Sequence, residues 1–336
     1  MEEIEMLNSE LKLNPKVFDD DVEQIPTRNG YGEGLLIAGE ENPNVVALSA
    51  DLTESTRAEA FAEKFPERFF EVGVAEQNMA TIAAGLGISG KVPFISSYAT
   101  FSPGRNYEQI RTTIAYNDAN VKVAGHHAGI SVGPDGATHQ ATEDIAIMRA
   151  MPNMKVIVPC DAIEAKKATL ATAKLWGPVY LRFGREKSPV ITSEETPFTP
   201  GKAFILWEPK GKKTDVAIVG CGMLLHHALL AAQALEKEKI HVLVVNSHTV
   251  KPLDEHTILA AAKKAGAVVS VEEHQIAGGL GGAIAELLAR RAPTPMEFVG
   301  LEDTFGESGK PEELLEKYGM GVDSIMKAVK KVLRRK

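Results

Sequence analysis

The sequence predicts an α/β protein of two domains, each built on a mostly parallel β-sheet flanked by helices. Helical and strand-like segments alternate along most of the chain, and a stretch with four prolines interrupts them between residues 188 and 213. The 336 residues are enough for two hydrophobic cores, and 44% hydrophobic residues are typical of a globular protein. We expect a polar preface at 1–23, a first domain at 24–187, a linker at 188–213 and a second domain at 214–336.

The order of the predicted elements supports parallel sheets with crossover helices. In the first domain, helices are expected at 30–41 and 58–66, and strands at 44–51, 68–73, 92–99, 121–129, 154–160 and 177–184. The second domain repeats the alternation, with strands expected at 215–222, 241–249 and 267–275 and helices at 224–238 and 255–266. Polar or glycine-rich segments follow the strands of the first domain. Ligands of open α/β sheets bind at these carboxyl ends.

Charge and cysteine content exclude several classes of function. A net charge of −8 argues against general nucleic-acid binding, and the basic tail KAVKKVLRRK is typical of a terminal helix. Cys160 and Cys221 are far apart in the sequence, which favours neither a disulfide framework nor a zinc site. The acidic N-terminus does not fit a signal peptide, and no apolar run approaches a membrane span. We expect a cytoplasmic protein without membrane partners.

Glycine-rich motifs in the second domain are better explained by packing than by cofactor binding. VGCGMLLHH lacks the third glycine of a dinucleotide fingerprint, and AGGLGGAIAEL lacks the lysine of a P-loop. We expect no catalytic cluster in this domain.

A histidine-rich loop in the first domain is a stronger candidate site. GHHAGISVGPDGATHQATED holds His126, His127, Asp135 and His139, without the spacing of a metal site. Histidines at a strand end could bind substrate oxygens or transfer protons near neutral pH. Arginines at the ends of predicted elements could bind phosphate or carboxylate, or form surface ion pairs; they are Arg28, Arg182 and Arg185.

Glu76 is the single acid of the segment EQNMATIAAGLGI, which is otherwise made mainly of small and apolar residues. Two interpretations stay open from the residues alone. Glu76 could complement the dipole in the first turn of a helix, which contributes a fraction of a kcal/mol. Alternatively, it is a buried carboxylate whose partner, a ligand nitrogen or a second protein, comes from outside the chain. The small residues would let another backbone pack closely.

Five ordered segments carry a resemblance to a known family: EVGVAEQNMATIAAGL, GRNYEQIR, HHAGISVGPDGATHQ, MKVIVPCD and LRFGRE. They resemble transketolase, in the half that follows its diphosphate-binding domain. The resemblance implies a pyrimidine-binding domain and a transketolase C-terminal domain, with thiamine diphosphate as cofactor. Glu76 matches the glutamate that contacts the aminopyrimidine ring and activates the cofactor. Phe101 matches the aromatic residue that packs on that ring, and Tyr98 is the alternative for this role. Asp51 matches an acid near the cofactor.

The resemblance also implies roles in substrate binding. His127, Asp135 and His139 match residues that bind donor hydroxyls, and the two histidines are also expected to assist proton transfer. Arg28, Ser55 and Arg185 match positions that bind the sugar phosphate. His126 matches no secure counterpart, and His274 receives no catalytic role.

One departure from the family is large. Transketolase begins with a domain whose G-D-G motif and downstream asparagine hold Mg²⁺, and nothing here matches it. The resemblance therefore implies the C-terminal subunit of a split transketolase of the pentose phosphate pathway, without a metal site of its own. We expect a partner chain that carries the diphosphate domain and Mg²⁺, with two copies of each chain.

Four alternatives stay open. The β subunit of a 2-oxo acid dehydrogenase has a similar plan, but that family lacks this histidine loop. Deoxyxylulose phosphate synthase shares a DGATHQ-like loop, whereas AEQNM and EQIR fit transketolase better. A ketotransferase for another sugar phosphate, or one that uses formaldehyde as acceptor, is the third. A non-catalytic scaffold subunit is the fourth, and the retained site residues argue against it.

Overall fold

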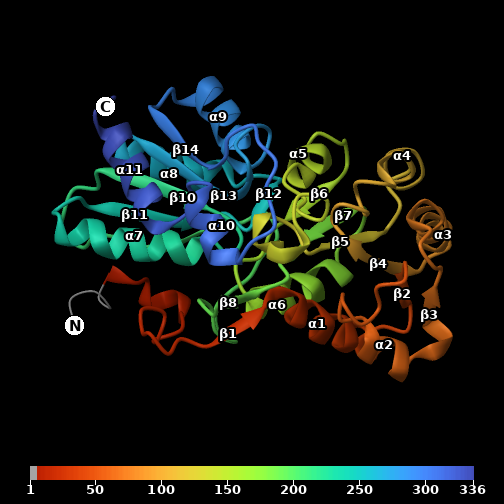
Figure 1. Ribbon diagram of the computed structural model, residues 1–336. Helices are drawn as coiled ribbons and strands as arrows, with labels where there is room; N and C mark the ends of the chain where they lie inside the picture. The colour runs from red at the N-terminus through yellow and green to blue at the C-terminus, as the bar shows by residue number, and fades with distance from the viewer. Residues whose placement is uncertain (1–5) are drawn as a thin grey trace.

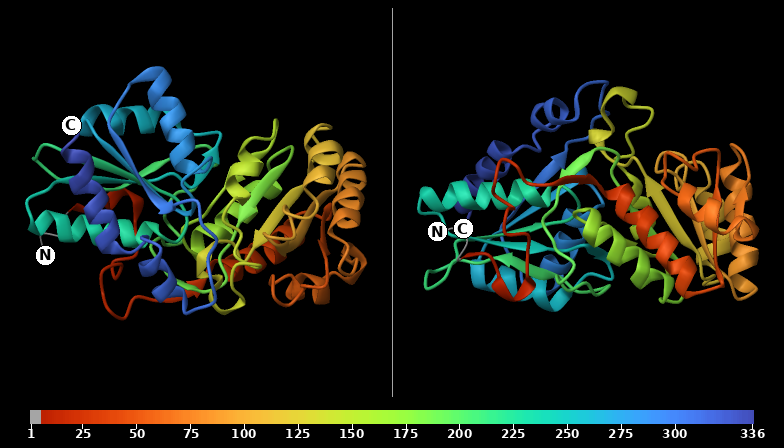
Figure 2. Two further views of the ribbon diagram at one scale, coloured as in Figure 1. Left: turned by 45° about the horizontal axis from the view of Figure 1, so that its top comes forward. Right: turned by 90° about the horizontal axis from the view of Figure 1, so that it is seen from below.

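The computed structural model describes residues 6–336, and they form two α/β domains that lie side by side (Figure 1). The first five residues of the predicted preface lie outside the described part. Each domain has its own parallel sheet between layers of helices, as the two turned views in Figure 2 show. The predicted fold class is confirmed.

The first domain is built on a seven-stranded sheet in the order β12-β6-β7-β5-β4-β2-β3. Six of its strands come from the first domain and are parallel. The five other than the edge strand β3 are largely buried, as strands covered on both faces require. The six strands are β2 (Val45–Ser49), β3 (Phe69–Glu71), β4 (Val92–Tyr98), β5 (Lys122–His126), β6 (Lys155–Ile157) and β7 (Val179–Arg182).

Helices cover both faces of this sheet. One core lies under α1 (Thr27–Glu41), α2 (Glu59–Lys64) and α6 (Ala162–Ala173). The other lies under α3 (Glu76–Ile88), α5 (Asp144–Arg149) and a π-helix at Ile110–Ala115 that continues the short α4 (Tyr107–Gln109). Two glycines let α1 approach α6 closely: a Cβ at Gly30 would lie 1.8 Å from the carbonyl oxygen of Ala162, and one at Gly34 would lie 2.8 Å from that of Lys166.

The second domain has a five-stranded sheet in the order β14-β13-β10-β11-β9. Its strands are β9 (Phe204–Trp207), β10 (Val216–Gly220), β11 (Val242–Asn246), β13 (Val268–Gln275) and β14 (Met296–Leu301). The apolar stripes of α7 (Leu225–Lys237) and α11 (Val322–Leu333) cover one face, and α8 (Glu255–Ala265) and α9 (Leu280–Arg291) cover the other. The short α10 (Pro311–Lys317) packs on the histidine-rich loop of the first domain, so it links this domain to the candidate site.

The linker and the preface are more ordered than the sequence predicted. The segment predicted as linker contains β9, which pairs antiparallel with β11, and most of β8 (Lys187–Pro189), which pairs with β1 (Gln24–Pro26). Pattern reasoning missed these strands because each has only three or four residues beside prolines. The preface is not simply polar, since it contributes Leu11 and Val17 to the core of the second domain.

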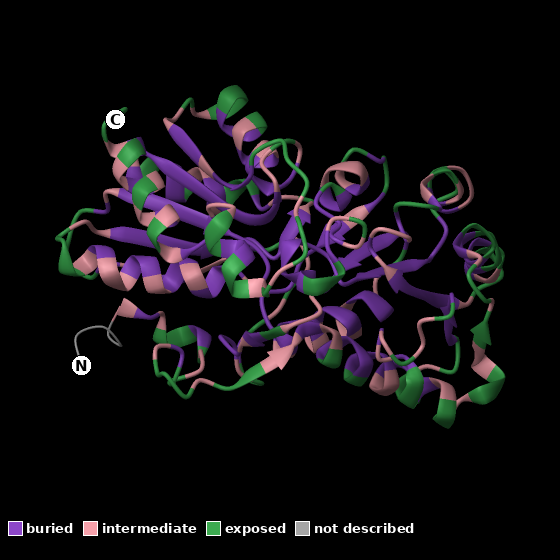
Figure 3. Cartoon of the chain, in the orientation of Figure 1, coloured by how far each residue is buried: buried purple, intermediate pink, exposed green. Residues whose placement is uncertain are grey.

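The two domains share one continuous hydrophobic core, which appears in Figure 3 as buried chain running across the junction. The second domain also lends β12 (Thr249–Lys251) to the edge of the first sheet, antiparallel to β6. A shared core and a shared sheet hold the domains as one body. No helix in the described part of the chain is both long and apolar enough to cross a membrane.

Candidate active site

The candidate site lies at the carboxyl ends of the parallel strands in the first sheet. Loops after β2, β4 and β5 carry Ser55, Phe101 and His127, while Glu76 begins α3 after β3 and Arg185 follows β7. Because parallel strands end at the same edge of a sheet, residues that are up to 157 positions apart meet there: the amide N–H of Gly184 donates to Thr27 Oγ1, 2.8 Å away.

Glu76 is the first residue of α3, and its side chain is only 1% exposed. Arg105 Nη1 donates to both of its carboxylate oxygens, at 2.8 and 2.7 Å. In the chain by itself Arg105 is the partner of the buried carboxylate, and a partner from outside the chain stays a prediction. The loop that carries Arg105 is tied down separately, since Asn106 Nδ2 donates to the backbone carbonyl of Glu76 at 3.0 Å.

Aromatic rings form a layer beside Glu76. Tyr98 stacks on His127, with ring centroids 3.9 Å apart, and on Phe101 at 5.8 Å. Phe101 also meets His139 edge to face at 5.5 Å. The guanidinium of Arg105 lies over Phe101, 4.5 Å from the ring centroid. Both aromatic residues that the sequence proposed as ring contacts therefore belong to one surface, and Phe101 is the one in contact with the cation that pairs with Glu76.

Arg28 and His127 form the polar end of the site. Arg28 Nη1 donates to the carbonyl oxygen of Ser55 at 2.9 Å and lies 3.1 Å from His127 Nε2. Burial, together with the charge of Arg28, lowers the pKa of His127 to about 3, so this histidine is neutral. Because an arginine only donates, Nε2 must accept and the ring proton sits on Nδ1. Nδ1 is buried and has no partner among the described residues.

The loop after β2 brings a further arginine to this end. Arg57 Nε donates to Asn29 at 3.1 Å, next to Arg28 in the first turn of α1. Burial lowers the pKa of Arg28, and the charges of Arg57 and Arg185 lower it further. Three arginines gathered at one end can bind an anion, and the carboxylates of Glu186 and Asp135 lie near only one of them, 3.4 and 4.0 Å from Arg185. Sequence reasoning missed Arg57, although its position two residues after Ser55 could have indicated it.

Arg185 reaches the histidine-rich loop rather than the Arg28 pair. Its Nη1 donates to the carbonyl oxygen of Val132 at 2.8 Å and lies 4.0 Å from Asp135. His139 Nδ1 lies 2.9 Å from Thr138 Oγ1. Arg185 therefore shapes the loop that carries Asp135 and His139, as well as adding positive charge near Arg28.

Asp51 lies two residues after the end of β2, in a left-handed conformation with φ of 61°. Its amide N–H donates to Glu71 at 2.7 Å, and Glu71 also accepts from Thr53 Oγ1 and the amide of Gly73. Glu71 thus ties the loop that holds Ser55 to the segment that leads into Glu76. No role was predicted from the sequence for Glu71.

His126 lies beneath the site rather than in it. Its ring is fully buried between Tyr31 and Phe183, with centroids 4.7 and 5.1 Å away. Burial holds its pKa well below the usual range. His274 is also buried, and it accepts from the amide of Ala146 at the domain junction. Arg182 is buried at the same junction, bonded to Asp144 at 2.8 Å, and so is not a ligand-binding arginine.

The residues fit a thiamine-type cofactor in chemistry. An aminopyrimidine ring needs a carboxyl group beside a ring nitrogen and a flat apolar face, and Glu76 and Phe101 supply these together. A planar guanidinium already satisfies both contacts, which indicates that a planar nitrogen-bearing group suits the place. A resident metal is not indicated, since no group of three His, Cys, Asp or Glu side chains within residues 6–336 could hold an ion.

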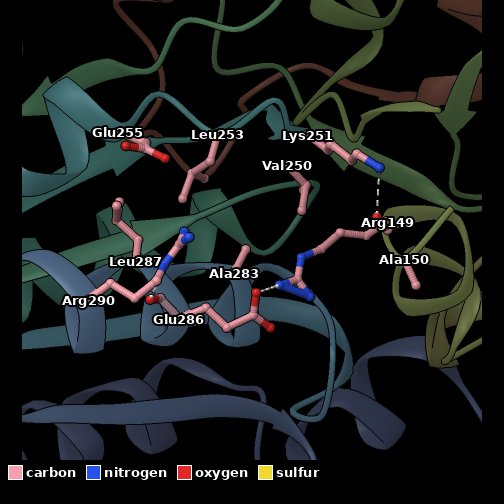
Figure 4. Close-up of a pocket in the computed structure, with 10 residues that line it drawn as sticks. All are labelled: Arg149, Ala150, Val250, Lys251, Leu253, Glu255, Ala283, Glu286, Leu287 and Arg290. Carbon is pink, nitrogen blue, oxygen red and sulfur yellow. Dashed lines mark hydrogen bonds and ion pairs between the residues drawn. The ribbon is translucent and has the colours of Figure 1, made fainter. Parts of the chain in front are cut away.

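A groove at the domain junction is distinct from this site (Figure 4). It encloses about 420 Å³ between α5, the segment after β12 and α9, and none of the predicted site residues lines it. Its cations are engaged, because Arg149 pairs with Glu286 and Lys251 donates to the carbonyl of Arg149 at 2.9 Å. We therefore interpret the groove as part of the junction between the domains and not as a ligand site.

Comparisons with known proteins agree with this geometry. A family model described as "transketolase, pyrimidine binding domain" matches residues 23–190, and one described as "transketolase, C-terminal domain" matches 206–325. A transketolase C-terminal section from Methanocaldococcus jannaschii is 44% identical over 92% of this chain and 96% of its own length. A 6-deoxy-6-sulfo-D-fructose transketolase subunit from a Clostridium strain is 40% identical over 95% and 98%.

Two further comparisons show how much of a related protein this chain covers. Human transketolase is 35% identical over 93% of this chain, which covers 50% of the human protein. A solved structure described as a split gene transketolase, an inactive β4 tetramer, has a TM-score of 0.86 and 45% identity, and the match covers 92% of this chain and 99% of the other.

Proposed function

The chain belongs to the transketolase family and corresponds to its C-terminal half, and from this premise we propose that it is the C-terminal subunit of a split, thiamine-diphosphate-dependent transketolase. It would transfer a two-carbon ketol unit between sugar phosphates, together with a second chain that holds the diphosphate and Mg²⁺. The observation that carries the proposal is the buried carboxylate of Glu76 beside Phe101, at the same sheet edge as the arginines and His127.

Each residue has a task in this proposal. When bound, thiamine diphosphate supplies a nucleophilic carbon and an electron sink. Glu76 would hold a proton at the pyrimidine nitrogen, and Phe101 and Tyr98 would give the ring a flat face. His127 Nδ1–H would donate to a substrate oxygen, while His139 would exchange a proton with a donor hydroxyl. Asp135 would bind a hydroxyl of the donor, and Asp51 would lie near the cofactor.

The substrate's anionic group would bind at the polar end. Arg28, Arg57 and Arg185 supply charge there, and the loop that carries Ser55 supplies polar groups. Phosphate suits such a cluster because guanidinium groups bind its oxygens in pairs. A sulfonate is the second candidate, because the Clostridium relative is named for a sulfo-sugar. The phosphate is proposed first, since three arginines favour a dianion over a monoanion.

An uncovered face supports a partner chain. Glu76 is the only charged residue of α3, and around this helix Val74 is 68% and Ile88 65% exposed. Ile82, between them on α3, is also 36% exposed, and exposed apolar residues along one helix can mark an interaction surface. We propose that the diphosphate-binding subunit and a second copy of this chain cover this region, which gives two copies of each chain in the cytoplasmic enzyme of the pentose phosphate pathway.

The test is reconstitution. This chain is mixed with a chain that carries the G-D-G motif and its asparagine, thiamine diphosphate and Mg²⁺, and two-carbon transfer from xylulose 5-phosphate to ribose 5-phosphate is measured. We expect activity in the mixture and little in either chain alone. A parallel assay offers 6-deoxy-6-sulfofructose as donor. Faster turnover of the sulfo-sugar would replace the phosphate assignment, and no transfer with either donor from two folded chains would refute the function.

A further inference from the structure

Arg105 occupies the place that the proposed function gives to the aminopyrimidine ring. Its Nη1 lies 2.8 and 2.7 Å from the two oxygens of Glu76, and its guanidinium lies 4.5 Å from the centre of the Phe101 ring. These are the two contacts, a carboxyl group and an aromatic face, that the ring would need. A guanidinium can make both because it is planar and carries N–H donors at its edge. Arg105 and the ring therefore cannot both be in place.

The ion pair between Arg105 and Glu76 also stabilises the chain before it meets a partner. The side chain of Glu76 is 1% exposed, and a buried carboxylate without a partner is strongly destabilising. Arg105 is the only cation that pairs with it among the described residues. A chain that must fold before its cofactor arrives would keep Glu76 satisfied in this way.

Arg105 is also free to leave. Its side chain is 45% exposed, so it reaches Glu76 from the surface rather than from the core. The surrounding loop does not depend on it, because Asn106 Nδ2 binds both the carbonyl of Glu76 and Ser102 Oγ, at 3.0 and 3.1 Å. Movement of one long side chain would uncover the carboxylate and the face of Phe101 without moving the backbone.

We propose that Arg105 is a built-in placeholder for the cofactor: it caps Glu76 in the unassembled chain, and it must swing outward for the aminopyrimidine ring to bind. The proposal rests on the cofactor assignment made above. It adds a regulatory step, because an unassembled chain with a capped Glu76 binds the ring poorly. Arg105 acts through Glu76 and Phe101 and is not a catalytic residue.

The direct test measures the binding of thiamine to the full-length chain by titration calorimetry, without any partner. We expect the Arg105→Ala variant to bind thiamine at least about tenfold more tightly than the wild type, because the ring no longer has to displace a cation. Arg111→Ala is the matched control, since Arg111 is an exposed arginine on the adjacent π-helix, and it should bind as the wild type does. Equal or weaker binding by Arg105→Ala, or no binding by any variant, would overturn the placeholder.

A second measurement covers the case in which Arg105→Ala folds poorly. Urea unfolding of the wild type, Glu76→Gln, Arg105→Ala and the double variant forms a double-mutant cycle. The placeholder requires that Arg105→Ala lowers the unfolding midpoint in the wild type and has little effect once Glu76 is glutamine. Additive effects would contradict it.

The outcome is separable from that of the reconstitution assay. Tight thiamine binding by Arg105→Ala with no two-carbon transfer would keep the placeholder and refute the transketolase reaction. Two-carbon transfer together with unchanged thiamine binding by Arg105→Ala would support the transketolase reaction and refute the placeholder.

Discussion

Two groups of buried polar side chains in the first domain differ in how completely they are hydrogen bonded. Asp161, at the start of α6, accepts from the amides of Glu164, Ile191 and Thr192 and from Thr192 Oγ1, all within 2.9 Å. At the site edge, by contrast, Nδ1 of His127 and Nε of Arg28 have no partner among the described residues.

Lys122 belongs with Asp161 in this comparison. Its Nζ is buried at the start of β5 and donates to Asn120 Oδ1 and the carbonyls of Leu175 and Gly177, at 2.6 to 2.8 Å. Three acceptors match the three N–H bonds of an ammonium group. Complete bonding is typical of side chains that hold the structure together, and we propose that a ligand fills the open valences of Arg28 and His127. The predictions below test this distinction.

The largest effect on activity is expected at Glu76. In the reconstituted enzyme, Glu76→Gln should lower kcat by about 10²–10⁴-fold, because an amide cannot exchange a proton with the ring nitrogen. The two-carbon transfer assay measures it, with circular dichroism to confirm folding. Glu40→Gln, an exposed carboxylate on α1, is the control and should change kcat little. Normal kcat in Glu76→Gln would remove this residue from the chemistry.

The largest effect on stability is expected at Lys122. Lys122→Met should lower the free energy of unfolding by roughly 2–4 kcal/mol, because it removes the Lys122 donor from the carbonyls of Leu175 and Gly177 and from Asn120 Oδ1, which keeps only the amide of Gly177. Urea denaturation measures it, and kcat of the assembled enzyme should stay within about twofold of the wild type, since Lys122 lies at the opposite end of β5 from His127. A large loss of kcat with unchanged stability would reverse the roles of the two groups.

The anion site should respond in KM. Arg57→Ala should raise KM for a phosphorylated acceptor by about 10–100-fold, because one charged hydrogen bond is lost. The neutral acceptor glycolaldehyde serves as the internal control, and its KM should not change. If KM rises equally for both acceptors, Arg57 supports the loop rather than binding the anion.

The smallest effect is expected on the pH dependence of stability, through Glu164 at the domain junction. Glu164 accepts from the amide of Cys160 and from Asn246 Nδ2, and burial, with the charge of Asp161, raises its pKa to about 7. The folded chain therefore binds a proton that the unfolded chain releases above its ordinary pKa of about 4.5. This contribution to stability is present below that ordinary pKa and is lost as the pH rises through 7.

The matching experiment compares Glu164→Gln with the wild type in urea at pH 5 and pH 8. From pH 5 to pH 8 the free energy of unfolding of the wild type should fall by roughly 1–3 kcal/mol more than that of the variant, because glutamine has no charge to bury. A difference that is independent of pH would show that Glu164 does not titrate in this range.

Much of the architecture followed from local pattern. Buried apolar strands that alternate with helical periods predicted both parallel sheets, because a strand covered on both faces must be apolar throughout. The strands β8, β9 and β12 could not be predicted, since each has three or four residues and is held by a partner strand far away in the sequence. Length alone does not decide this, because the three-residue β3 and β6 lie in runs that were predicted as strands, whereas the six-residue β14 was missed.

The sequence by itself determined which loops belong to the proposed site. The order of motifs placed Glu76, His127 and Arg185 after strands, and strand ends of a parallel sheet share one edge. Only the tertiary structure decided what those side chains do there. It paired Glu76 with Arg105, buried His127 beside Arg28, placed His126 and Arg182 in the interior and brought Arg57 to the proposed site. These outcomes depend on distances and burial between residues far apart in the chain, which no local pattern contains.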